Sequence, residues 1–356
     1  MASVTERRLT HEHDRRRAER FCARFGLWAP ILLAPMAGAT PPSLSIAVMR
    51  AGGLGACGAL RMRPADEVRA AAPGPFQLNL WVPDPPPVRD TAREGRPRVS
   101  REPGPSGSAR SQGRDPAGFR DPVCGGAGRA PADRVVDHGP VSPAVRGDAQ
   151  GARDPLVRDH LHRHGGTGRA AGADVTVARG MEAGGRRGSF DSAAAERGQV
   201  GLLALPPAVA DAVGVPVVGT GGIADERGVA AALTLGASAV QIGTGFLRCP
   251  EAQIHPAWAD AITRAAPEET VLSRVFSGRA SDSIPTDYVR AATASDKPPT
   301  APNPVQAGLT APMMRAAAER EGDARMTFLA GQSAALARAE PAGNIVRALR
   351  GAQKPC

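Results

Sequence analysis

The sequence predicts an α/β protein, a (β/α)8 barrel of the TIM type with a C-terminal helical extension. Short β-branched apolar runs alternate with segments whose apolar residues recur at spacings of three and four, which is typical of a chain of strands and helices. The clearest unit covers residues 215–247, where one strand ends on Gly221 and Gly222, a helix follows, and a second strand ends on Gly243 and Gly245.

Glycine turns at the carboxyl ends of two neighbouring parallel strands let backbone N–H groups converge on an oxyanion. In a TIM barrel the phosphate site lies after the last two strands. One such turn is explained equally well by the need for a tight bend. Two turns at this spacing predict a ligand that carries a phosphate.

Six strands can be placed in order along the translated chain. They cover residues 30–36, 54–59, 76–81, 173–178, 215–219 and 238–242. Helices are predicted between them over residues 43–50, 64–72 and 206–213. An eight-stranded barrel needs two further strands to close.

Three regions make up the predicted domain organisation. Residues 1–25 are expected to form a disordered leader, residues 26–265 the barrel, and residues 266–356 a loop and helical extension with helical patterns over 311–321, 327–337 and 341–350. No apolar run is long enough to span a membrane, and the N-terminus lacks the apolar core of a secretory signal. A cytoplasmic location is therefore expected.

The segment 91–169 interrupts the barrel with a different composition. It has no Ile, Met, Lys, Trp or Tyr, and residues 91–170 hold 14 arginines against 9 acidic residues, a net +5 of the chain's +9. One interpretation is a disordered insertion, too poor in apolar residues to fold. The other, which we favour, is a segment translated out of frame.

The genetic code supports the frameshift. Residues 135–141, back-translated and shifted by one base, can read SSIMGLF, and residues 151–166 can read ARGIRWFATISTVTE. Both readings are typical of barrel strands and would bring the count to eight. A compensating slip is then expected near residues 167–169.

This hypothesis removes one candidate metal site. His160, His162 and His164 have the look of a ligand cluster, but they lie in the anomalous segment, so we expect no metal there. The five cysteines are scattered without a CxxC pair, which indicates neither a disulfide framework nor a zinc site.

Outside the leader and the anomalous segment, the chain resembles the nitronate monooxygenases, formerly called 2-nitropropane dioxygenases. The motifs are APMAG (34–38), AGGLGACGA (51–59), FQLNLW (76–81), MEAGGRRGSF (181–190), GGIADERGVAAALTLGASAVQIGTGF (221–246), FSGR (276–279) and LAGQ (329–332). The resemblance implies an FMN-containing barrel that oxidises alkyl nitronates or nitroalkanes with O2 to a carbonyl compound and nitrite.

The resemblance also implies which residues hold the cofactor. Ala34, Pro35 and Met36 would line the isoalloxazine ring, although core packing explains Met36 equally well, and Asn79 would hydrogen-bond near it. The expected phosphate and cofactor contacts are Gly184, Gly185, Gly221, Gly222, Gly243 and Thr244, with Gln241 and Gln332 as ring or substrate contacts.

Arg186 is the departure from the family pattern. The family motif reads EAGGHRG, in which the histidine is the proposed base or orienting group, whereas this chain reads EAGGRRG. A guanidinium donates hydrogen bonds but does not accept a proton near neutral pH. Arg186 would therefore hold a preformed, anionic nitronate, with Glu182 as an orienting residue, unless it is only a solvated neighbour of Arg187.

Two alternatives remain at the sequence level. The first is a related flavin barrel such as an NAD(P)H-dependent enoyl or quinone reductase, because glycine turns do not determine which electron donor is used. An arginine-rich nucleic-acid-binding protein is the other, and it predicts salt-dependent DNA binding and no yellow colour. The favoured partners are a nitronate or nitroalkane, O2 and a second copy of the chain in a homodimer, without nucleic acid or membrane.

Overall fold

The computed structural model describes residues 4–36, 38–58, 63–71, 74–80, 133–137, 156–160, 173–189, 195–319 and 323–351. All of them belong to one compact unit, Met1–Pro83 with Ala130–Cys356. Most of the anomalous segment, residues 91–169, lies outside the described residues, and so do His162 and His164.

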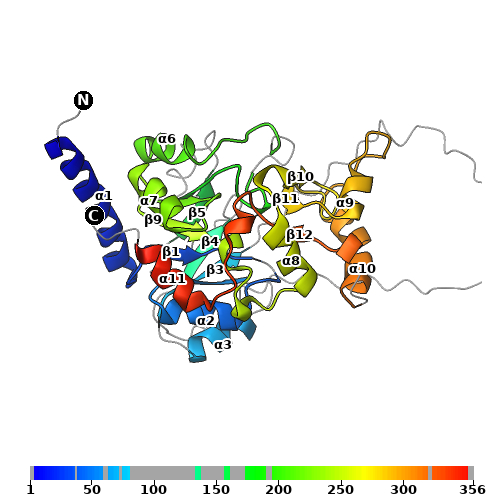
Figure 1. Cartoon of the computed structure of the whole chain (residues 1–356), viewed down its shortest axis with the longest axis horizontal. Coiled ribbons are helices and arrows are strands. Elements are labelled where there is room, and N and C mark those ends of the chain that lie inside the picture. The colour runs from blue at the N-terminus through cyan, green and yellow to red at the C-terminus, as the bar shows by residue number, and fades with distance from the viewer. Residues whose placement is uncertain are drawn as a thin grey trace, which may run out of the picture. The chain divides into compact units, whose positions relative to one another are not determined.

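Eight parallel strands form the central sheet, which confirms the α/β class (Figure 1). They are β1 (Ile31–Leu33), β2 (Gly55–Gly58), β3 (Phe76–Leu80), β4 (Asp133–Asp137), β5 (Leu156–His160), β6 (Val175–Arg179), β8 (Val217–Thr220) and β9 (Ala239–Ile242). Their order is β1-β9-β8-β6-β5-β4-β3-β2. Parallel strands carry their carboxyl ends to one edge, so the residues that follow β1, β3, β6, β8 and β9 gather there.

The two outermost strands of this order also meet. Leu32 forms a parallel bridge with Leu54 just before β2, the Leu33 N–H donates to the Leu54 carbonyl at 2.8 Å, and the Leu54 N–H donates to the Ile31 carbonyl at 2.9 Å. β1 is therefore hydrogen-bonded on both sides, to β9 and to the segment that leads into β2.

β4 and β5 lie within the anomalous segment, residues 91–169. The backbone of the chain as translated forms strands there, with Val135 paired to Leu156 and Val157 paired to Val175. These are close to the two stretches in which the base-shifted sequence predicted strands. The frameshift itself stays a prediction.

Helices follow the strands as the periodicity predicted: α2 (Pro42–Arg50), α3 (Arg63–Ala71), α6 (Leu205–Ala212) and α7 (Glu226–Thr234). Asp225 is the N-cap of α7, where its carboxylate accepts the Gly228 N–H at 3.1 Å. The final helix, α11 (Ala342–Arg350), buries Ile345, Val346 and Leu349 in the same core as α2 and α7.

The N-terminal region corrects one expectation. Residues 1–25 were predicted to be a disordered leader, whereas Val4–Phe25 form helix α1. Ala18, Phe21 and Phe25 are buried at helical spacing, and the two phenylalanine rings, 4.5 Å apart, join the core with Leu32, Leu54, Val175 and Val218. The helix packs against the sheet because burial of these apolar side chains removes them from water.

The region after residue 265 also differs from the prediction. Besides α9 (Asp287–Ala292) and α10 (Val305–Glu319), it holds most of a small sheet, and α8 (Pro256–Arg264) comes just before it. This sheet contains β7 (Gly185–Arg186), β10 (Val271–Ser273), β11 (Ser281–Ile284) and β12 (Phe328–Leu329). The helix predicted over 327–337 is wrong, because β12 pairs with β11 there and only a short 3-10 turn, η7 (Ala334–Leu336), follows.

The other 3-10 turns of the described chain are η3 (Thr244–Phe246), η4 (Pro250–Ala252), η5 (Pro267–Glu269) and η6 (Asp323–Arg325). None of the described helices combines the length and the apolar character that crossing a bilayer requires.

Candidate functional site

A cavity of about 270 Å³ lies at the carboxyl ends of the strands. All but one of the residues that the sequence predicted for the site line it: Ala34, Pro35, Met36, Asn79, Glu182, Gly184, Gly185, Arg186, Gly221, Gly222, Gln241, Gly243 and Thr244. Gln332 is not among the lining residues, although its backbone N–H donates to the Glu182 carbonyl at 3.0 Å. The fold therefore brings the predicted residues together, while their roles remain proposals.

One end of the cavity has the features of a phosphate cradle. Gly221 and Gly222 after β8 adopt φ of +113° and +66°, which residues with a Cβ rarely reach. After β9, Gly243 leads directly into η3. Among the described residues, no hydrogen bond uses the backbone N–H groups of Gly222, Gly243 or Thr244, three residues that line the cavity, so these donors are available to an anion.

The turn after β1 forms a second wall. The Ala34 N–H donates to the Ile242 carbonyl at 2.8 Å, which continues the β1–β9 pairing to the edge of the sheet. Thr40 fixes the turn, because its Oγ1 accepts the Met36 N–H at 2.8 Å and donates to the Met36 carbonyl. A Cβ at Gly243 would lie 3.2 Å from Met36 Sδ, so the wall approaches the cradle closely.

The amide of Gln241 lines the cavity and contacts a second buried amide, that of Gln77. Gln241 is 5% exposed, and its Oε1 lies 3.3 Å from Gln77 Nε2, which also donates to the Leu33 carbonyl. Gln77 itself is 1% exposed, and sequence reasoning did not single it out. Asn79, half-buried at the end of β3, sits opposite Gly58 in the parallel register, and both line the cavity.

Glu182 faces the loop beside the cavity. Its two carboxylate oxygens lie 2.8 and 3.0 Å from the Leu202 backbone nitrogen, whose N–H they accept. Its Cβ lies 3.2 Å from the position that a Cβ at Gly222 would take. Glu182 thus links the loop after β6 to the cradle, which fits the predicted orienting role.

Four arginines line the cavity: Arg179, Arg186, Arg187 and Arg279. Sequence reasoning singled out only Arg186. Its side chain is exposed at the mouth, and the pKa of its guanidinium is lowered, first because surrounding protein removes part of its hydration and then because of the positive charge of Arg279. The positive charges of Arg186 and Arg279 repel each other, and a bound anion would reduce this repulsion.

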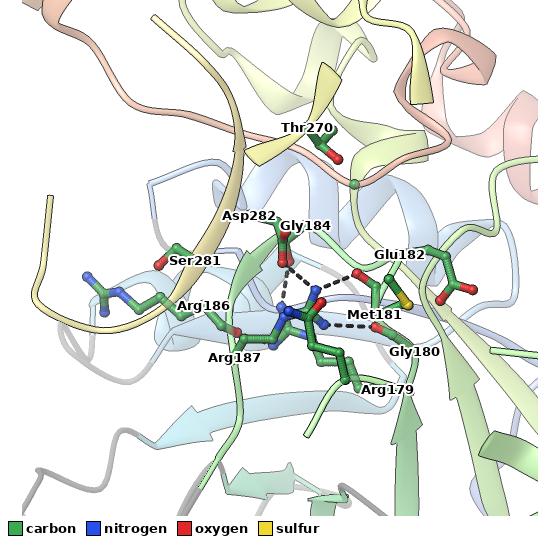
Figure 2. A network of polar contacts seen from close by, with 12 residues as sticks. Arg179, Gly180, Met181, Glu182, Gly184, Arg186, Arg187, Thr270, Ser281 and Asp282 are labelled. Atoms are coloured by element: carbon green, nitrogen blue, oxygen red, sulfur yellow. Dashed lines mark hydrogen bonds and ion pairs between the residues drawn. The ribbon is translucent and has the colours of Figure 1, made fainter. Parts of the chain in front are cut away.

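The loop that carries Arg186 is held by its neighbours (Figure 2). Arg179, at the end of β6, donates to the carbonyls of Gly184, at 2.6 Å, and of Arg186. Arg187 is 4% exposed, and its guanidinium donates to the carbonyls of Gly180 and Met181 and pairs with Asp282 of β11.

The C-terminal region supplies lining residues that the sequence did not predict, including Leu329, Gly331 and Ser333, and α8 supplies Trp258. Gly331 donates its N–H to Thr244 Oγ1 at 3.0 Å, which ties this region to the cradle. The LAGQ motif was the available signal, but it directed attention to Gln332 rather than to the glycine before it.

Comparisons with known proteins agree on one family. The sequence model of the nitronate monooxygenase family matches residues 164–351. A nitronate monooxygenase of Pseudomonas aeruginosa is 36% identical over 350 residues, 93% of this chain and 98% of the relative. A probable nitronate monooxygenase of Bacillus subtilis is 32% identical, over 88% of this chain and 92% of the relative.

Two solved structures resemble the chain over most of its length. A nitroalkane oxidase from Streptomyces ansochromogenes has a TM-score of 0.75 and 29% identity, covering 91% of this chain and 95% of that one. FabK from Thermotoga maritima has a TM-score of 0.68 and 26% identity, covering 94% and 95% of the two chains.

Proposed function

Because the chain belongs to the nitronate monooxygenase family, a family of oxidoreductases, we propose that it binds FMN in this cavity and uses O2 to oxidise alkyl nitronates. The products are a carbonyl compound and nitrite. The observation that carries the proposal is one cavity with an unpaired N–H cradle at one end and arginines at its mouth.

The residues present fit a flavin nucleotide. The N–H groups of Gly222, Gly243 and Thr244 would receive the phosphate, where the absence of a Cβ at the two glycines lets it approach. The ring would lie between the Ala34–Met36 turn and the amide of Gln241. A bound flavin supplies the capacity to accept electrons from the substrate and to pass them to O2.

Arg186 would bind and orient the substrate. A guanidinium can donate two parallel hydrogen bonds to the two oxygens of a nitronate, which adds both affinity and orientation. The lowered pKa of Arg186 still leaves it protonated near neutral pH, because an arginine titrates far above that range. Arg186 therefore holds the anion and removes no proton from it.

The described lining of the cavity offers no base that is free to remove a proton, which favours substrates that are already ionised. Among the described residues that line the cavity there is no histidine, and the Glu182 carboxylate is engaged by the Leu202 N–H. A neutral nitroalkane must first lose a carbon-bound proton, and proton transfer of this kind needs a positioned base. We therefore expect preformed nitronates to be the better substrates.

Two further features belong to the proposal. The Leu32–Leu54 bridge supports a sheet that closes into a barrel, since it joins the two ends of the strand order. The frameshift remains our explanation of the composition of residues 91–169, and sequencing the gene beside close relatives tests it: unshifted reading frames near codons 94 and 168 would contradict it.

Purification of the full chain tests the function. We expect a yellow protein with a flavin spectrum, or one that takes up added FMN, and nitronate-dependent O2 consumption with release of nitrite. A chain that is colourless, cannot be reconstituted with FMN and shows neither reaction would overturn the proposal. Oxidation of NAD(P)H coupled to reduction of an enoyl compound or a quinone would instead favour a flavin reductase, for which the likeness to FabK is the supporting observation.

A further inference from the structure

The ion pair between Asp282 and the cavity-lining Arg187 joins two parts of the chain that are distant in sequence (Figure 2). Arg187 follows β7, whereas Asp282 belongs to β11 of the C-terminal region. Their side chains are almost fully buried, at 2% and 10% exposed. Asp282 is not among the cavity-lining residues that the structure describes, and its carboxylate contacts the lining residue Arg187.

Backbone pairing reinforces this connection. In the antiparallel pairing of β7 with β11, Arg186 lies opposite Ser281 and Gly185 lies opposite Asp282. The Arg187 N–H donates to the Ala280 carbonyl at 2.9 Å. The position of Arg186 is therefore set on its C-terminal side by the anchored Arg187 and by β11.

The buried Arg187–Asp282 ion pair is not explained by a contribution to the stability of the fold. Removing two charges from water is costly, and apolar residues of similar size often stabilise a fold as well or better. Burial raises the pKa of Asp282 and outweighs the opposing effect of the Arg187 and Arg179 charges, so the carboxylate bears this cost. The arrangement gives instead a fixed direction to Arg187, whose guanidinium also holds the Gly180 and Met181 carbonyls.

We propose that Asp282 is a positioning residue for substrate binding, which fixes through Arg187 the loop that presents Arg186 to an anion at the cavity mouth. This inference rests on the proposed function, in which Arg186 holds the nitronate. It assigns a role in binding to the small C-terminal sheet, and in particular to β11.

The sign of the effect separates positioning from simple electrostatics. Asp282→Asn removes a negative charge near the mouth, so by Coulomb's law alone an anion should bind more tightly. If Asp282 positions the loop, the same substitution should bind an anion more weakly, because Arg187 loses its partner and Arg186 its placement.

Nitrate is a suitable probe, since it is a planar oxyanion like the nitronate group and does not react. Calorimetric titration of the flavin-loaded full chain should show nitrate binding that Asp282→Asn weakens by at least about tenfold, in line with the effect of small displacements in a site. Nitronate turnover, where present, should show a raised KM with little change in kcat. Unchanged or tighter nitrate binding by folded Asp282→Asn would overturn the proposal.

Two controls complete the test. Glu226→Gln removes an equivalent charge from an exposed pair with Arg338, 3.5 Å long, and should leave nitrate binding unchanged. The double variant Arg187→Met/Asp282→Leu replaces the pair by apolar residues, keeps the packing and supplies the test if Asp282→Asn does not fold. We expect it to bind nitrate weakly, and wild-type binding by it would refute positioning. Wild-type chain that binds nitrate but does not consume nitronate would count against the proposed function alone.

Discussion

Gly184→Ala should separate the C-terminal region from the phosphate cradle. A Cβ at residue 184 would lie 2.3 Å from the Ala330 carbonyl carbon and 2.4 Å from the Gly331 nitrogen. Both are backbone atoms of the facing segment, so no side-chain rotation relieves the clash. An ordinary contact needs about 3.4 Å or more, and the two segments must therefore move apart by about 1 Å.

The cost follows from the bonds that cross this contact. The Gln332 N–H to Glu182 carbonyl bond and the Gly331 N–H to Thr244 Oγ1 bond are both 3.0 Å long, and a 1 Å displacement breaks them. Overpacking costs about 1–3 kcal/mol, and each lost hydrogen bond about 0.5–1.5 kcal/mol. We expect the free energy of unfolding to fall by about 2–6 kcal/mol and FMN binding to weaken, because Thr244 borders the cradle.

Denaturant unfolding and FMN titration measure these two effects. The control is Gly214→Ala, because a Cβ at that loop residue meets nothing within 4 Å, so its unfolding free energy should change by less than about 1 kcal/mol. If Gly184→Ala matches the control in both unfolding and FMN affinity, the close approach of the two segments does not exist in solution.

The remaining predictions use other parts of the molecule. Phe21→Ala should lower the free energy of unfolding by about 3–5 kcal/mol in the same assay, because the ring is 3% exposed; no change would mean that α1 does not pack on the core. Arg186→His should raise kcat/KM for neutral nitroalkane relative to nitronate, measured as nitrite release, and an unchanged ratio would contradict the role given to Arg186. The raised pKa of Asp282 means that the native state keeps a proton that the unfolded state has released, so between about pH 4 and the native pKa the unfolding free energy falls as pH rises. Asp282→Asn should remove this slope, and a persistent slope would assign it to other groups. Burial raises the pKa of the Cys249 thiol to about 12, so a thiol reagent at pH 8 should label Cys249 only in denaturant, as mass spectrometry of the labelled peptide would show.

The sequence predicted the elements whose pattern is local. The apolar runs that became β1, β8 and β9 and the spacing that became α7 lie where the periodicity placed them, because each strand is buried on both faces and each helix on one. The glycine turns after β8 and β9 were readable because each needs a residue without a Cβ: Gly221 and Gly222 adopt positive φ, and a Cβ at Gly245 would lie 2.9 Å from Ile242 Cγ2. The positions of the cradle and of Arg186 thus followed from the sequence.

What the sequence did not predict depends on contacts between distant residues. β11 reads Ser-Asp-Ser-Ile, which has no alternating apolar pattern, and it is a strand because β7, β10 and β12 pair with it. Helix α1 was hidden by its many charged residues, although Ala18, Phe21 and Phe25 carried the spacing of a buried face. Arg187 and Arg279 gave no local signal, because only the fold brings them to the cavity.

The origin of the lining residues bears on how the anomalous segment affects function. None of the cavity-lining residues that the structure describes comes from residues 91–169; the cradle, the Arg186 loop and the C-terminal wall all lie after them, and the Ala34–Met36 turn and Asn79 lie before. A change of reading frame in that segment would alter the two strands β4 and β5 and leave the described site residues as they are. In a chain with an altered segment, the described binding groups would keep their identity, and the change in β4 and β5 would reach them through the stability of the sheet.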